Sequence, residues 1–445
     1  MLRICTNNLT IIVIVFLGII QLGISVTPGG AAINVATPGA QLFHKGGIGD
    51  CDGCHLMHNT SGEGGNTDPG SLTNNVYGLK GSDPSSTCLN CHQAPASNLN
   101  PLQHYIATNP AQMSQGVPPR ELTPGGDFGW LKKNYKWARN ESSPGERHGH
   151  NIVAADYNYS ADTSIPVSPG GSYPSGGLSC ISCHDPHGNY RRLKDGTIGT
   201  DGPPIVASGS YNNSPDPDAN GTVSVYRMLA GKGYTPKYLA GGNAFVSDPP
   251  AAVAPASYNR QESASDTRVA YGSGMSEWCG NCHASIHNDN YPGTRIHPSG
   301  NFAKLSGDVS NDYNAYIGSG NLNGNAESSY TSMVPFETGT NDYADLKGTA
   351  NSNNANRNGA SGSDNVMCLT CHRAHASGWD GMTRWNMQAE FLVYNGRYPG
   401  VDNGAPDNIA QGRSAAEVQK TFYDRPATSY ACYQRSLCNK CHAKD

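Results

Sequence analysis

Six copies of one pentapeptide constrain this chain more than any other feature of its sequence. Each copy has two cysteines three positions apart, followed directly by a histidine. The copies occupy Cys51–His55, Cys88–His92, Cys180–His184, Cys279–His283, Cys368–His372 and Cys438–His442, and they use twelve of the 14 cysteines. Six copies are not accidental in a chain of this composition, so the chemistry of the motif must govern the fold.

Two thiols at this spacing can add to both vinyl groups of one haem, and the adjacent histidine then binds the iron as proximal ligand. The sequence therefore predicts six covalent c-type haems. Their attachment residues are Cys51, Cys54, Cys88, Cys91, Cys180, Cys183, Cys279, Cys282, Cys368, Cys371, Cys438 and Cys441, with proximal ligands His55, His92, His184, His283, His372 and His442. Zinc held by paired Cys-x-x-Cys units would give no role to a histidine after every second cysteine. A thioredoxin-like redox pair would occur once, beside a βαβ pattern.

Of the 15 histidines, nine remain to supply the sixth ligand of six irons. We expect the distal ligands to be His58, His104, His150, His187, His297 and His375, with His44, His148 and His287 in reserve. His58, His187 and His375 each follow a proximal histidine by three positions. They cannot reach the far face of that haem, so we expect them to bind a neighbouring one. Methionine is the alternative distal ligand, but it raises the potential and the histidines suffice.

The composition indicates a fold without a large apolar core. Glycine (54) and proline (29) are abundant among 445 residues, and only 36% of residues are hydrophobic. Such a loop-rich chain cannot easily supply a core for its length. We expect mostly irregular coil with a few short α-helices and little strand, built around a core of stacked haems. The net charge of -5, with no run of Lys or Arg, excludes a nucleic-acid partner.

Regular structure is expected at few places. A helical turn should form at each haem motif, and Ser414-Ala-Ala-Glu417 is a capping box that predicts a helix running toward Tyr423. A second helix is predicted over Met382 to Tyr394. The polar segments Thr349 to Asp364 and Pro166 to Gly177 are interpreted as surface insertions without function.

The N-terminus has the pattern of an export signal. Arg3 precedes the apolar stretch Leu9 to Ile24, and small residues allow cleavage after Ser25, which predicts a signal peptide over residues 1–25. The alternative is an uncleaved membrane anchor. Residues 26–42 form an extension that is trimmed or disordered, and residues 43–445 form a single hexahaem unit. Cys5 would leave with the signal, so Cys432 remains as a buried free thiol, with an intermolecular disulfide as the alternative.

Outside the haem motifs, the sequence resembles the extracellular hexahaem cytochromes of metal-reducing bacteria. The resemblance runs from Phe43 to the C-terminus and includes loops with no role in haem attachment. It is carried by Phe43-His44, Thr123–Trp130, Gly149–Asp156, His184–Arg192, Val253–Arg260, Arg268–Cys279, Arg373–Gly378 and Tyr433–Asp445. The resemblance implies an extracellular filament, polymerised head to tail, in which stacked bis-His haems run through successive subunits. Residues 26–42, Cys432 and the Asn-rich insertion depart from the family pattern.

Three functions fit six haems. The first is an electron conduit that is a homopolymer, receives electrons from other cytochromes and delivers them to extracellular acceptors such as metal oxides. The second is a soluble periplasmic shuttle, which needs no subunit contacts. The third is a multihaem reductase, but such an enzyme needs an open iron, and the spare histidines suffice to close every site. For the conduit we expect His58, near a chain end, to ligate an iron of the neighbouring subunit.

Overall fold

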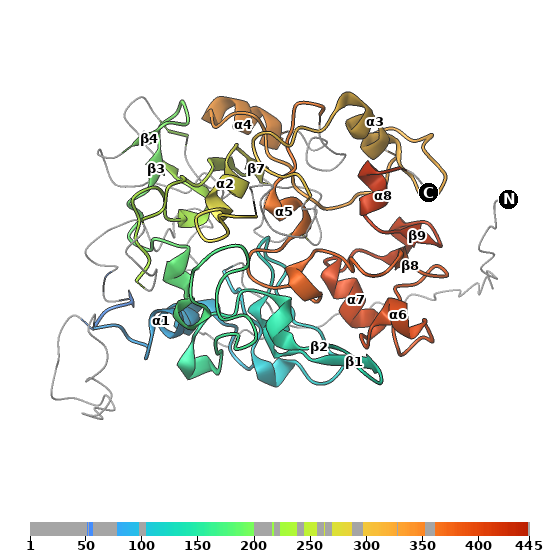
Figure 1. Cartoon of the computed structure of the whole chain (residues 1–445), viewed down its shortest axis with the longest axis horizontal. Coiled ribbons are helices and arrows are strands. Elements are labelled where there is room, and N and C mark those ends of the chain that lie inside the picture. Colours follow the sequence, from blue (N-terminus) through green and yellow to red (C-terminus); the bar gives the residue numbers. More distant parts are fainter. Residues whose placement is uncertain are drawn as a thin grey trace, which may run out of the picture. The chain divides into compact units, whose positions relative to one another are not determined.

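Most of the chain is loop, held in place by short helices and isolated pairs of strands (Figure 1). The computed structural model describes residues 51, 53–56, 78–97, 104–199, 216–217, 223–237, 244–255, 262, 269–286, 297–326, 328–351 and 361–443. The chain divides into two compact units, Met1–Gln41 and Leu42–Asp445, and every described residue belongs to the second. The predicted signal peptide and extension therefore lie outside the described residues, as does most of the Asn-rich insertion.

The helices are short, and several of them coincide with haem motifs. The α-helices are α1 (Pro84–His92), α2 (Met275–Cys279), α3 (Gly307–Ala315), α4 (Tyr343–Asn351), α5 (Cys368–Cys371), α6 (Asp407–Ala410), α7 (Ala415–Thr421) and α8 (Cys438–Cys441). Single 3-10 turns cover Pro110–Gln112, Phe128–Lys132, Gly145–His148, Ala155–Tyr157, Ser175–Gly177, Cys180–Ser182, Tyr226–Met228, Asp380–Met382 and Ala427–Ser429. No helix among the described residues is long and apolar enough to cross a membrane.

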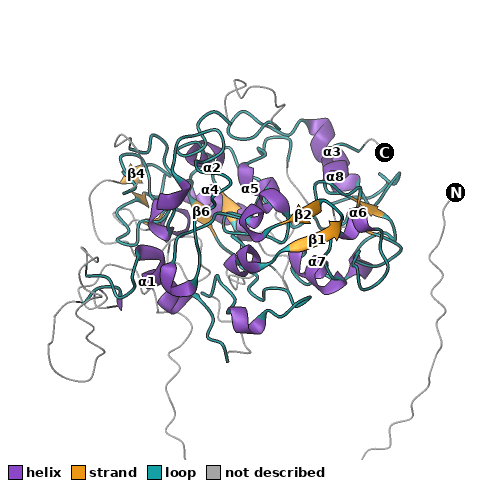
Figure 2. Cartoon of the chain, turned by 60° about the horizontal axis from the view of Figure 1, so that its bottom comes forward, coloured by secondary structure: helices purple, strands orange, loops and turns teal. Residues whose placement is uncertain are grey.

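In the described part of the chain, the strands form four small antiparallel sheets rather than one layer (Figure 2). Their bounds are β1 (Tyr135–Ala138), β2 (Glu141–Ser143), β3 (Arg191–Arg192), β4 (Ile198–Gly199), β5 (Val223–Ser224), β6 (Ala252–Val253), β7 (Ala270–Tyr271), β8 (Phe391–Val393) and β9 (Gln434–Arg435). β1 pairs with β2, β3 lies between β4 and β5, β6 pairs with β7, and β8 pairs with β9. The prediction of irregular coil with a few short helices and little strand is confirmed.

Two predicted helices had opposite outcomes. Helix α7 forms as expected: the Ser414 side chain accepts from the Glu417 backbone N–H, and the Glu417 side chain accepts from Ser414 in return. The helix predicted over Met382 to Tyr394 is wrong. Gly381 and Met382 adopt left-handed backbone angles (φ 66° and 49°), and residues 391–393 pair with β9 instead. A left-handed start is incompatible with helix propagation.

The apolar core is divided into several separate clusters. The largest contains Tyr316, Trp379, Trp385, Val418 and Leu437, and others surround Tyr226, Leu89 and Leu346. Clusters of this size leave much of the interior to another material. This division agrees with a fold whose middle is occupied by haem.

Candidate metal centres

Every haem motif closes into one helical turn. The backbone N–H of the histidine donates to the carbonyl of the first cysteine, four positions earlier, at 2.8 to 3.0 Å in the five motifs outside α1. In the second motif the same turn forms the end of α1. The turn brings the two thiols and the imidazole to adjacent positions, as haem attachment requires. None of the twelve motif cysteines is in a disulfide bond.

Five of the proximal histidines face a second imidazole across a gap. The ring-centroid distances lie between 6.0 and 6.4 Å for His55 and His187, His92 and His104, His184 and His375, His283 and His150, and His442 and His297. Each pair joins a predicted proximal ligand to a predicted distal one. The structure thus brings together ten of the twelve candidate iron ligands.

The gap between the rings fits a metal ion. An imidazole nitrogen binds a first-row metal at about 2.0–2.1 Å, and the ring centre lies roughly 1.1 Å further from the metal, so two opposed ligands place their centroids about 6.2 Å apart. The five observed distances, 6.0 to 6.4 Å, bracket this value. The residues present therefore fit bis-His haem iron.

Main-chain carbonyls determine which nitrogen of each ring is available to a metal. Because a carbonyl can only accept, each Nδ1 bonded to one must carry the proton, which leaves the Nε2 lone pair for iron. Six of the described candidate ligands make such a bond from Nδ1. They are His92 to His104 O (2.7 Å), His184 to Arg227 O (2.9 Å), His283 to Pro169 O (2.8 Å), His372 to Gly381 O (2.8 Å), His150 to Ala374 O (2.7 Å) and His297 to Pro298 O (2.9 Å). Such bonds also increase the basicity of the ligand.

Burial favours the neutral form, which is the form that can bind iron, in four of the candidate ligands. Loss of solvation lowers the pKa of His150 to about 4 and that of His375 to about 3, and the neighbouring imidazoles His283 and His184 lower them further. The pKa values of His92 and His184 are also lowered, chiefly by burial. Phe128 stacks on the His375 ring at 4.7 Å and fixes its orientation.

The motif cysteines show the spatial order of the haem sites. Cys88 of the second motif lies beside Cys180 of the third, whose N–H donates to Ser85 Oγ of α1 at 3.1 Å, and Cys279 of the fourth lies beside Cys368 of the fifth. The remaining neighbours lie within electrostatic range of each other, namely Cys54 and Cys91, Cys183 and Cys282, and Cys371 and Cys438. The six motifs therefore follow one another in space in their order along the chain.

The first, third and fifth motifs share a main-chain clamp. In each motif, the backbone N–H of the residue after the proximal histidine donates to the carbonyl of a residue with left-handed backbone angles. That residue is Gly78, Met228 or Met382. Two positions beyond that residue, an N–H returns to the second cysteine of the motif: Lys80 to Cys54, Ala230 to Cys183 and Arg384 to Cys371, at 2.8 to 2.9 Å. These are also the motifs with a histidine three positions after the proximal one. The chain therefore contains a three-fold structural repeat of odd-numbered motifs.

The repeat has a consistent pairing rule. His187 of the third motif faces His55 of the first, and His375 of the fifth faces His184 of the third. Each such histidine thus faces the proximal ligand two motifs earlier. Among the described residues, no imidazole faces His372 of the fifth motif in this way. His58, the corresponding histidine of the first motif, lies outside the described residues, as do His44 and His287.

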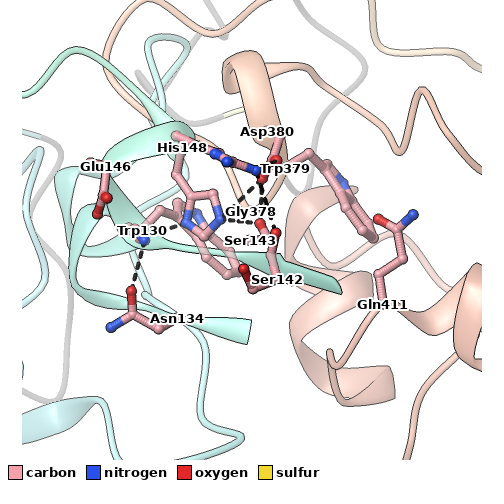
Figure 3. A network of polar contacts seen from close by, with 12 residues as sticks. Trp130, Asn134, Ser142, Ser143, Glu146, His148, Gly378, Trp379, Asp380 and Gln411 are labelled. Atoms are coloured by element: carbon pink, nitrogen blue, oxygen red, sulfur yellow. Dashed lines mark hydrogen bonds and ion pairs between the residues drawn. The ribbon is translucent and has the colours of Figure 1, made fainter. Parts of the chain in front are cut away.

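His148, held in reserve as a ligand, has a structural role instead. It is completely buried, with Nδ1 donating to Trp130 O (2.9 Å) and Nε2 2.7 Å from Ser143 Oγ (Figure 3). Ser143 also bonds Asp380 and accepts from Arg413 Nη2 at 2.8 Å. Both ring nitrogens are therefore occupied by protein groups, and no lone pair is available to iron. The network joins the segment before His150 to the segment that carries Gly381.

Two interpretations of the sequence are wrong. The loop Pro166 to Gly177 is not a functionless insertion, since Pro169 O accepts from His283 and Ser168 Oγ donates to Cys282 O at 2.6 Å. The pair Gly170-Gly171 was the feature of the sequence that could have indicated this close approach, because a Cβ on Gly171 would lie 1.8 Å from Cys282 O. Cys432 is not a free thiol but disulfide-bonded. The other acceptors of the Nδ1 bonds were also missed, because any residue can supply a carbonyl.

Covalent haem attachment with paired axial imidazoles is the arrangement of those multihaem c-type cytochromes that transfer electrons and are not enzymes. No family model matches the sequence. The chain is nevertheless 50% identical over 427 residues, 95% of its length and 99% of the relative's, to the C-type cytochrome OmcS of Geobacter sulfurreducens. It belongs to the OmcS family and carries six haems c.

Solved structures support the same conclusion. The Outer Membrane Cytochrome S filament from Geobacter sulfurreducens matches with a TM-score of 0.78 and 49% identity, covering 90% of this chain and 100% of that one. A cryo-EM structure of the OmcS nanowires from the same organism matches with a TM-score of 0.79 and 50% identity, with the same coverage. The fold, including its loops, is therefore that of these cytochromes.

Proposed function

We propose that this chain is the subunit of an extracellular filament that conducts electrons through six bis-His haems per subunit. Electrons would enter from other cytochromes and leave to acceptors such as metal oxides. The proposal includes export by the signal peptide of residues 1–25, trimming or disorder of residues 26–42, and one hexahaem unit over residues 43–445. It draws on the likeness to the OmcS filament and nanowires.

The ligand set belongs to this proposal. The distal ligands would be His187, His104, His375, His150 and His297 for the haems of His55, His92, His184, His283 and His442, respectively. Ring separations near 6 Å support this assignment, and so do the bonds from Nδ1 of His150 and His297 to main-chain carbonyls. In this arrangement each distal histidine of the odd-numbered motifs ties two haem sites together, and close contact between haems is what an electron relay needs.

His372 is the observation on which the filament proposal depends. By the same pairing rule, the histidine after the first motif would face a proximal ligand two motifs before it, which a neighbouring subunit would supply. The fifth motif, in turn, has no facing imidazole among the described residues. A head-to-tail polymer satisfies both ends at once, with His58 of one subunit ligating the iron of His372 in the next. Assembly and completion of the iron site then become the same event.

His58→Ala tests this assignment. The variant should carry six attached haems, one of them five-coordinate and high-spin, and should remain as single subunits in electron micrographs. His187→Ala is the matched control, because it removes the corresponding ligand within the subunit: it should also give one high-spin haem, yet still form filaments. Filaments of His58→Ala with all six haems low-spin would overturn the proposal.

The soluble shuttle remains the second candidate. It shares the bis-His sites but would have to complete the iron of His372 with a histidine of its own chain, and the likeness to filament structures does not favour it. Particle size distinguishes the two functions, because a shuttle would remain monomeric with every iron six-coordinate in the wild type.

A further inference from the structure

Glu337 is a completely buried carboxyl group between the fourth and fifth haem motifs. Its side chain is 0% exposed, and its backbone bridges Tyr271 of β7 on one side and Asn365 on the other. Oε2 accepts a hydrogen bond from the backbone N–H of Met275 at 3.1 Å, while Oε1 has no hydrogen-bond partner. A buried carboxylate oxygen without a donor strongly disfavours the ionised form.

Two haem-bearing elements meet at this carboxyl. Met275 begins α2, which ends at Cys279 of the fourth motif. Ser276 Oγ in the same helix accepts from the backbone N–H of Cys368, the first cysteine of the fifth motif, at 3.0 Å. Helices α2 and α5 lie side by side (Figure 1). The carboxyl is therefore within electrostatic range of both haem sites.

The charged groups around Glu337 do not hold it ionised. Burial, and to a smaller extent the carboxylate of Glu277 in α2, raises the pKa of Glu337 to about 8, although the hydrogen bond from Met275 N–H acts in the opposite direction. Cys368 also raises the pKa as a thiolate, but this contribution disappears once the sulfur is a thioether. Two segments flank Glu337. Tyr271 of β7 lies on one side. On the other side, the segment of Asn365 carries the carboxyl group of Asp364 and pairs with the segment of Lys304, whose side chain is exposed. No described lysine or arginine forms an ion pair with Glu337.

Glu262 shows the contrast. It is equally buried, yet its carboxylate forms ion pairs with Arg373 and with Arg384 at 3.6 Å. Two guanidinium groups therefore compensate the buried charge of Glu262. Glu337 lacks this compensation, so its charge depends on other charges that change nearby. The charges that change in this protein are those of the haem irons.

We propose that Glu337 is a redox-linked proton site, which takes up one proton from solvent when one electron reduces the iron of the fourth or fifth haem. Oxidation of that iron releases the proton, so the net charge of the pair is unchanged. Glu337 is a positioning residue for charge, because it acts on the potential of the haem and does not touch the iron. The inference rests on the proposed function only in that the fourth and fifth motifs carry haem.

The sign of the pH dependence follows from the iron charge. A ferric site carries one more positive charge than a ferrous site and therefore lowers the pKa of Glu337 relative to the reduced protein. Between the two pKa values, reduction binds a proton, so the potential must fall as pH rises. The value of about 8 applies without iron charge and marks the approximate upper end of this range. Potentials of one or two haems should therefore fall between about pH 6 and 8 and then become constant.

The test is a spectroelectrochemical titration of the six haems between pH 6 and 9. Glu337→Gln, which keeps the acceptor for Met275 N–H, should remove the pH dependence from the affected haems. Glu277→Gln should retain the dependence but move it to lower pH, because a repelling charge is lost. Glu141→Gln on exposed β2 is the matched control and should change nothing. An unchanged pH dependence in Glu337→Gln would overturn the proposal.

Infrared difference spectra of the wild type keep the proposal testable even if the variant does not fold. Reduction at pH 7 should produce the carbonyl band of a protonated carboxylic acid. Its absence in the wild type would refute proton uptake by a carboxyl group. Because haem propionates could also give such a band, its persistence in Glu337→Gln would refute the assignment to Glu337. The measurement needs loaded haems but no polymer, so a failure of filament assembly leaves its outcome interpretable.

Discussion

His55 and His187 face each other at a centroid distance of 6.4 Å with their ring planes only 14° apart, although they come from different haem motifs. Other pairs are almost perpendicular, at 84° for His92 and His104 and 78° for His297 and His442. The protein therefore imposes different ligand orientations on chemically identical sites. In the two perpendicular pairs, main-chain carbonyls hold Nδ1 of His92 and of His297.

Ligand orientation predicts two classes of ferric electron paramagnetic resonance signal. Parallel imidazole planes separate the energies of the two iron d orbitals that point between the ligands, whereas perpendicular planes leave them nearly equal. The haem of His55 should give a rhombic low-spin signal, and those of His92 and His442 highly anisotropic ones. His187→Ala should remove the rhombic component alone. A spectrum that keeps this component in the variant would contradict the assignment.

His148→Ala should destabilise the fold without opening an iron. The variant loses hydrogen bonds at both ring nitrogens and leaves a buried cavity, at an expected cost of about 2–4 kcal/mol in the free energy of unfolding. All haems should remain low-spin. His150→Ala, two positions away, should do the reverse and give one high-spin haem. Thermal denaturation and optical spectra of both variants check the prediction, and a high-spin signal in His148→Ala would count against it.

His148 should also make the fold sensitive to acid. Burial, and secondly the charge of Arg413, lowers its pKa to about 3 in the folded protein. The unfolded chain has an ordinary pKa near 6.5 and binds a proton first, so stability falls as pH drops from about 6.5 toward 3, by at most about 1.4 kcal/mol per pH unit. His148→Gln cannot titrate and should show a shallower loss. Parallel slopes in denaturant titrations of the two proteins would disprove this contribution.

Gly171→Ala should disturb the fourth haem through the loop. The added Cβ would lie 1.8 Å from Cys282 O, so the loop must move away from the motif. Loss of the bond from His283 Nδ1 to Pro169 O makes the ligand less basic and should raise the potential of this haem. Gly176→Ala, in the same loop with open space around its Cβ, is the control. Equal potentials in the two variants would show that the loop does not tune the site.

The chain should not fold without haem. Its apolar residues form separate clusters, and conformational entropy then exceeds what they can offset. Expression without haem attachment should give an unfolded, protease-sensitive product by circular dichroism. A native-like spectrum of the apo chain would show that the protein core alone is sufficient.

Sequence reasoning succeeded where the determining interactions are local. The haem-motif turn and the capping box of Ser414 and Glu417 depend on residues within four positions, so they could be predicted. The distal pairings could not, since His150 meets His283 through contacts between distant segments. The false helix after Met382 failed for the same reason: its left-handed backbone is held by Arg373 N–H from another segment.

The six Nδ1 bonds end on main-chain carbonyls, so no particular side chain is needed to orient these ligands. Selection can therefore change surface and loop residues freely while the cysteines, histidines and backbone path remain. A chain that shares only half its residues with OmcS can keep the same haem scaffold and still differ in surface charge, solubility and choice of partner. The surface of the protein can therefore evolve separately from the haem chain that carries the electrons.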